Sequence, residues 1–221
     1  MEYNFNKQKL TKIERIKYFF KKPSKLFEEI NIETCSEFYF ILIMLFSAIT
    51  SFVNSTFLKD ILNQTIIDSL RKTIISIHAP EYAELLTTPS IQIITTMIFL
   101  CVSLFFTSFL YFIIILLLSR KEKYKPVFSE VFNIYLIASL VTSIGNIIKS
   151  LFMFATNNPV FLKTTDKTSF NSILINQFDP FLFLKMFLLI MGFTIVFKFS
   201  IKKSTLAVLA VWVGTIGMLF I

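Results

Sequence analysis

Long apolar runs alternate with short polar segments along most of this chain. A bilayer core of about 30 Å is crossed by roughly 17 to 25 apolar helical residues. Backbone N–H and C=O groups inside lipid must be paired within their own segment, so such runs predict helices rather than open strands. The pattern therefore predicts an all-α, polytopic integral membrane protein with five transmembrane helices, at residues 38–57, 91–118, 128–154, 181–199 and 205–221.

Two segments outside these runs have helical periodicity. In 11–20, Thr11 and Glu14 have the spacing of a capping box, and basic residues surround an apolar stripe. We expect this amphipathic helix either to lie on the anionic inner leaflet or to pack under the helical bundle. A second stripe over 58–77 predicts an outer amphipathic helix between spans one and two, on the membrane or capping the bundle. The first stripe consists of Leu10, Ile13, Ile16 and Phe20.

The first 37 residues are polar and basic and contain no apolar stretch long enough for the core of a signal peptide. We expect a cytoplasmic N-terminal segment, 1–37, followed by a five-helix transmembrane domain, 38–221. The first span then acts as the membrane signal.

The distribution of lysine and arginine predicts the orientation, because short basic loops stay cytoplasmic. Eight of these residues lie in 1–37, four in 119–127 and three around the turn 200–204. Five lie in the predicted loops of the opposite side, and two lie within spans. The bias predicts a cytoplasmic N-terminus and an external C-terminus.

Composition excludes most soluble classes and offers little for catalysis. Hydrophobic residues make up 55% of the chain and charged residues 16%. The two cysteines, Cys35 and Cys101, suggest neither a disulfide framework nor a metal site. His78 is the one histidine and has no carboxylate cluster near it in the sequence. No glycine-rich phosphate loop, HExxH or GxSxG motif occurs, so we expect no cofactor and no enzymatic activity.

Two lysines fall within predicted spans. Lys149 lies late in the third span and Lys185 lies early in the fourth, so both are near the predicted outer interface. They are either anchors whose ammonium groups reach the headgroups, or the rim of a shared polar pocket with Asn146. The candidate contacts for an anionic lipid or ligand are therefore Lys149, Lys185 and Asn146, and those for the inner leaflet are Lys12, Arg15, Lys21 and Lys22.

The order of these parts resembles a known family. A basic segment containing FFKKPSKLFEEI at 19–30 precedes the spans, and an Asp-Pro-Phe sequence opens the fourth span at Asp179. Gly192 lies within that span, and Trp212 lies in the fifth. Together they resemble bacterial members of the YIP family, the Ypt-interacting-protein-like proteins. Eukaryotic relatives act in Golgi and ER membrane traffic and bind Rab-type GTPases, but their Asp-Leu-Tyr-Gly-Pro motif is absent here, so Rab binding is not implied.

The functional hypothesis is a non-enzymatic membrane scaffold or adaptor that organises lipid or a partner membrane protein through its basic inner surface. The alternative is a transporter or permease subunit for a lipid or small anionic solute, with Lys149 and Lys185 lining a polar path; a membrane-embedded enzyme is a third hypothesis, which lacks catalytic groups. We expect a multi-pass location in the bacterial plasma membrane. The expected partners are anionic lipids and another membrane protein such as an ABC transporter, with no nucleic acid.

Overall fold

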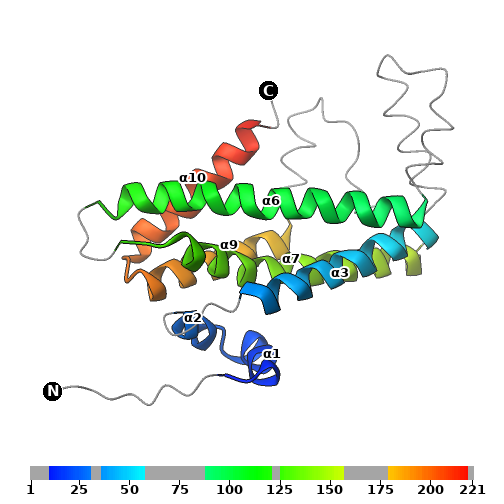
Figure 1. The fold of residues 1–221 in the computed structure, drawn as a ribbon, viewed down its shortest axis with the longest axis horizontal. Helices are drawn as coiled ribbons and strands as arrows, with labels where there is room; N and C mark the ends of the chain where they lie inside the picture. Colours follow the sequence, from blue (N-terminus) through cyan, green and yellow to red (C-terminus); the bar gives the residue numbers. More distant parts are fainter. Residues whose placement is uncertain (1–9, 31–35, 58–87, 121–124, 157–178, 219–221) are drawn as a thin grey trace. The chain divides into compact units, whose positions relative to one another are not determined.

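The computed structural model describes residues 10–30, 36–57, 88–120, 125–156 and 179–218. Within these ranges every regular element is an α-helix, which confirms the predicted all-α fold (Figure 1). In chain order the helices are α1 (Lys12–Lys21), α2 (Ser24–Ile30), α3 (Ser36–Phe57), α6 (Pro89–Leu118), α7 (Phe128–Thr156), α9 (Pro180–Val196) and α10 (Ile201–Met218).

Each of the five apolar runs contains a helix, but the helices differ in length. Among the described residues, α3, α6 and α7 are long and apolar enough to cross a membrane. α9 is apolar but has 17 residues, and α10 has 18 residues with two lysines in its first turn. The structure therefore supports a membrane protein with several apolar helices, and the count of five spans stays a prediction.

The turn between α9 and α10 lies earlier than the sequence predicted. α9 ends at Val196, three residues before the predicted end of the fourth span, and Lys198 adopts a left-handed backbone with φ of 54°. α10 already begins at Ile201, because the Ser200 carbonyl accepts the Ser204 N–H at 3.1 Å. The predicted turn at 200–204 was wrong, since two of its lysines belong to the first turn of a helix.

The chain divides into two compact units, and α3, α6, α7 and α9 each contribute residues to both. Unit 1 contains α1, α2, the start of α3, the end of α6, the start of α7, most of α9, and α10. Unit 2 contains the remaining parts of α3, α6 and α7 and the start of α9. The ranges are Met1–Ile41, Ser103–Ser139 and Leu184–Ile221 for unit 1, and Leu42–Val102 and Leu140–Phe183 for unit 2.

The first part of α7 forms the centre of unit 1. All of its residues from Val131 to Ser139 are buried. The aromatic ring of Tyr135 lies 5.7 Å from that of Tyr111 in α6, whose ring in turn lies 5.6 Å from that of Phe193 in α9. α7 is also the most buried of the three long apolar helices. This buried part of α7 is mostly apolar but includes Asn133 and Ser139, and its ring contacts link it through α6 to α9.

α3 and α6 expose much of their apolar surface instead. On α3 the exposed residues Ile41, Leu45, Ile49 and Phe52 recur at helical spacing and form one stripe. α6 exposes large side chains along most of its length, including Phe99 at 77%. Contiguous apolar surface of this extent would be unfavourable in water, so these faces are suited to lipid.

Several sequence predictions lie outside the described residues. These are the amphipathic helix at 58–77, the single histidine His78, and Cys35.

Candidate functional site

The first helix begins with the capping box that the sequence predicted. The Thr11 hydroxyl accepts the Glu14 N–H at 3.3 Å, and the Glu14 carboxylate accepts the Thr11 N–H at 2.8 Å. The Thr11 hydroxyl also donates to the Glu14 carboxylate at 3.0 Å. The hydrogen bond from the Thr11 backbone and then that from its hydroxyl hold the pKa of Glu14 below its ordinary value. Two otherwise unpaired backbone donors are satisfied, so α1 starts at a fixed residue.

α1 is joined to α2 by a buried ion pair. Arg15 Nη2 lies 2.7 Å from Oε1 of Glu29, and Arg15 Nε lies 3.2 Å from both carboxylate oxygens. Oε1 also accepts the Leu10 N–H at 3.2 Å. Both side chains are buried, so the geometry satisfies two charges that would each be unfavourable alone.

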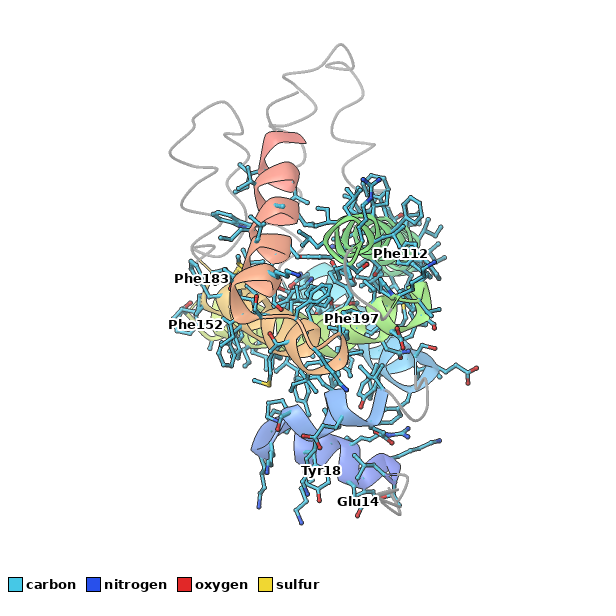
Figure 2. The ribbon with its side chains drawn as sticks, turned by 90° about the vertical axis from the view of Figure 1, so that its left-hand side faces the viewer. Glu14, Tyr18, Phe112, Phe152, Phe183 and Phe197 are labelled. Atoms are coloured by element: carbon cyan, nitrogen blue, oxygen red, sulfur yellow. The ribbon has the colours of Figure 1, made fainter. Side chains whose placement is uncertain are left out.

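This pair decides which face of α1 points outward. Successive helical residues are about 100° apart, so the apolar stripe cannot face the same side as Arg15. Ile13 is 79% exposed and Phe20 is 70% exposed, and Ile16 is also exposed. Figure 2 labels Glu14 and Tyr18, whose side chains extend from α1. α1 therefore packs through a charged residue and leaves its apolar stripe uncovered.

The four predicted inner-leaflet residues fall into two groups. Lys12, Lys21 and Lys22 are exposed on α1 and at its C-terminal cap. Arg15 is instead engaged by Glu29, so its role in this structure is to hold the helix pair together. No local pattern predicted this pairing, because Glu29 lies fourteen residues away on another helix.

α2 is attached to the apolar helices through Phe27, which is fully buried. A Cβ atom added to Gly192 of α9 would lie 3.0 Å from Phe27 Cε1 and 2.5 Å from Ile134 Cγ2 of α7. A larger residue at 192 would therefore clash with both side chains. The glycine noted in the sequence is the position at which α9 is approached by Phe27 of α2 and by Ile134 of α7.

Lys185 of α9 has a partner inside unit 1. Its Nζ donates to the hydroxyl of Tyr135 at 3.0 Å and lies 4.2 Å from the centre of the same ring. The tyrosine thus supplies both a hydrogen-bond acceptor and the face of an aromatic ring to one ammonium group. Sequence reasoning missed Tyr135, because an aromatic residue within an apolar run is usually a packing residue.

Lys149 of α7 has its partners inside unit 2. Its Nζ pairs with Oδ2 of Asp179 and lies 5.5 Å from the centre of the Phe181 ring. Oδ1 of Asp179 also accepts the Phe181 N–H at 3.0 Å, which caps the start of α9. The Phe181 ring packs against Gly145, where an added Cβ would lie 2.6 Å from Cδ2. One carboxylate therefore fixes both the helix start and the lysine.

The three candidate ligand contacts belong to two different units. Lys149 belongs to unit 2 and Lys185 to unit 1, and each has its polar partner within its own unit. Asn146, also in unit 2, is exposed on α7. In the part of the chain that the structure describes, no group of three or more His, Cys, Asp or Glu side chains is arranged to hold a metal ion.

Comparison with known proteins gives one match. A family model described as the Yip1 domain matches residues 17–221. The matched segment begins inside α1 and includes α2 and all the apolar helices. Comparison with curated proteins and with solved structures finds no match.

Proposed function

Since this chain belongs to the Yip1-domain family and has several helices suited to a bilayer, we propose that it is a membrane scaffold or adaptor without enzymatic activity. In this proposal five helices span the plasma membrane of a bacterium, with the N-terminus inside and the C-terminus outside. The basic N-terminal side binds lipid or a partner membrane protein.

The composition of unit 1 supports this orientation. It contains α1 and α2, the end of α6 near Arg120, the start of α7 near Lys125, and the turn at Lys198. These are the three basic segments assigned to the cytoplasmic side from the charge distribution. Their membership of one compact unit supports the part of the proposal that puts these three segments on the same side of the membrane.

The observation that carries the scaffold proposal is the position of Phe27 at Gly192. A basic segment without tertiary contacts would have no fixed arrangement of its charges. Here Phe27 places α2 against α9 at Gly192, and the Arg15–Glu29 pair attaches α1 to α2. The exposed lysines of α1 are thereby held as a preorganised surface, which lowers the entropic cost of binding a partner.

The partners of the two lysines favour a scaffold over a permease. A polar path for an anionic solute needs cations that are available to the solute. Lys149 is neutralised by Asp179, and Lys185 is held by Tyr135. Each lysine thus contributes to packing within its unit, which supports a structural role for both.

The test is photo-crosslinking in the cells that encode the protein, with a photoreactive residue in place of exposed Lys21. The scaffold proposal predicts a discrete adduct with one membrane protein or with lipid, which the double variant Lys12→Glu/Lys22→Glu weakens at equal expression. Glu28→Gln, at an exposed position of α2, is the control and leaves the adduct unchanged.

A parallel measurement addresses the alternative function. Purified protein in liposomes is assayed for anion efflux and for lipid movement between leaflets. The scaffold proposal predicts no rate above that of protein-free liposomes. A rate that Lys149→Met or Lys185→Met abolishes, together with no adduct at Lys21, would replace the scaffold by the permease.

A further inference from the structure

We propose that α1 is an interfacial helix that inserts its exposed apolar stripe into an anionic lipid leaflet. The stripe consists of Ile13, Ile16 and Phe20. The proposal rests on the scaffold function and deepens it. It identifies phospholipid as the ligand of the apolar stripe on α1.

The first support is the orientation of α1 in the folded chain. An amphipathic helix that belonged to the bundle would turn its apolar stripe toward the other helices. α1 does the opposite, because the side that faces α2 carries Arg15 and Glu29 neutralises it. Ile13 and Phe20 are left with more than two thirds of their surface exposed. An apolar face that remains exposed after the helix has packed can contact another apolar environment, such as the acyl chains of a lipid leaflet.

The second support is the charge on either side of the stripe. At about 100° per residue, Lys12 lies on one side of Ile16 and Lys17 lies on the other side of Ile13. Both lysines are exposed. Apolar side chains flanked by lysines match a leaflet surface, where ammonium groups meet lipid phosphates while the apolar side chains reach the acyl chains.

The third support is the short connection from the α1–α2 pair to the first apolar helix, α3. α3 begins six residues after α2 ends, and an extended chain of that length spans about 20 Å. Phe27 also places α2 next to α9, because a Cβ added at Gly192 would lie 3.0 Å from Phe27 Cε1. The helix pair is therefore held beside apolar helices. The bilayer that surrounds such helices is then within reach of α1.

The capping box adds a fourth argument. Many membrane-binding helices are disordered in water and lose conformational entropy when they fold on lipid. α1 is already formed, with Thr11 and Glu14 closing its first turn and Arg15 fixing its rotation. Binding then needs only the approach of a preformed face, which favours a stable rather than a transient contact.

The experiment measures the depth of α1 in full-length protein reconstituted into lipid nanodiscs. Nitroxide labels are attached at Ile13→Cys or Phe20→Cys after Cys35 and Cys101 have been replaced by alanine. Glu28→Cys, at an exposed position of α2, is the matched control for a label in water. Discs contain phosphatidylcholine alone or an equal mixture with phosphatidylglycerol.

With phosphatidylglycerol present, the labels at 13 and 20 should collide more often with oxygen and less often with a water-soluble nickel chelate than the label at 28. The difference should shrink when Lys12 and Lys17 are both changed to glutamate. It should also shrink at about 1 M salt, where the Debye length falls to roughly 3 Å. Collision rates at 13 and 20 that equal those at 28 in both kinds of disc would overturn the proposal.

Two further outcomes are informative. Labels shielded from both oxygen and nickel would mean that protein covers the stripe, which also overturns the lipid proposal. The scaffold function is judged separately by the charge-dependent adduct at Lys21: an adduct with a membrane protein while α1 stays in water would retain the adaptor and remove only the lipid contact.

Discussion

Arg15 and Glu29 form a buried ion pair whose shortest contact, from Nη2 to Oε1, is 2.7 Å. This pair joins α1 to α2 and sets the orientation of α1, so that the apolar stripe of α1 faces outward. It also explains why a cation in a basic amphipathic segment is not available to lipid. The consequences of breaking it can be measured directly.

Changing Glu29 to glutamine should release α1 from α2. The guanidinium of Arg15 would then be buried without a counter-charge, and breaking such a pair typically costs about 3 to 5 kcal/mol. Because α1 can separate without unfolding the apolar helices, the loss should appear as faster amide hydrogen exchange in α1 with little change in α7. The double variant Arg15→Met/Glu29→Leu should restore slow exchange, since no charge remains buried. Fast exchange in that double variant would show that α1 needs the pair itself.

Gly192→Ala should destabilise the protein, although alanine favours helix formation. The new methyl group would lie 2.5 Å from Ile134 Cγ2, and overpacking of this kind costs about 1 to 3 kcal/mol. Gly214→Ala in α10 is the matched control, because its Cβ would meet no heavy atom within 4 Å. The control should be neutral or stabilising by about 0.5 to 1 kcal/mol. Thermal unfolding in detergent distinguishes the two, and equal melting temperatures would contradict the contact at Gly192.

Lys149→Met should lower the melting temperature, because it leaves the Asp179 carboxylate without its cation. The pair is partly exposed, with side-chain exposures of 20% and 23%, so the expected loss lies between those of surface and buried pairs, about 1 to 3 kcal/mol. Adding Asp179→Asn should recover most of it, since asparagine still accepts the Phe181 N–H. If the double variant is less stable than Lys149→Met, the two residues do not act as a pair.

Tyr135→Phe separates the two interactions of Lys185. The variant removes the hydroxyl acceptor at 3.0 Å and keeps the ring at 4.2 Å. A hydrogen bond to a charged group contributes about 1.5 to 3 kcal/mol, so a measurable loss of stability is expected. Lys185→Arg in the wild-type background retains the charge and should unfold at nearly the wild-type temperature. An unchanged melting temperature for Tyr135→Phe would mean that the hydroxyl contributes nothing.

Membrane orientation can be tested with single cysteines in a background without Cys35 and Cys101. The charge distribution predicts that a cysteine at Lys125 is on the cytoplasmic side and one at Thr165 is outside. An impermeant maleimide added to intact cells should therefore label position 165 and not position 125. Lysed cells provide the control, in which both should react. The reverse pattern in intact cells would invert the topology.

The sequence was sufficient to predict the helices but not their partners. Apolar runs of spanning length and the Thr11–Glu14 spacing are local signals, and each corresponds to a helix or a cap in the structure. Arg15 was grouped with the lysines because nothing local distinguishes it from them. Its partner Glu29 lies on a second helix, so the pairing depends on how α1 and α2 meet.

The same limit applies to the lysines in apolar helices. Asp179 was recognised as the start of a helix, where a carboxylate suits the helix dipole. Its second role as the partner of Lys149 depends on how α7 and α9 meet, which no spacing in the sequence reports. The predicted start of the last helix was wrong for a different reason: lysines next to a turn resemble loop residues, yet Lys202 and Lys203 belong to the first turn of α10.

The place of Phe27 at Gly192 also imposes an order on biosynthesis. The two residues are 165 positions apart, so α2 leaves the ribosome long before the helix that receives its aromatic ring. At about 5 to 20 residues per second, the interval is roughly ten to thirty seconds. During that time α9 has not been synthesised, so Phe27 lacks its packing partner. The apolar side chains of the nascent N-terminal segment then stay exposed or are covered by another molecule. The burial of Phe27 against Gly192 thus has to wait until α9 has been made.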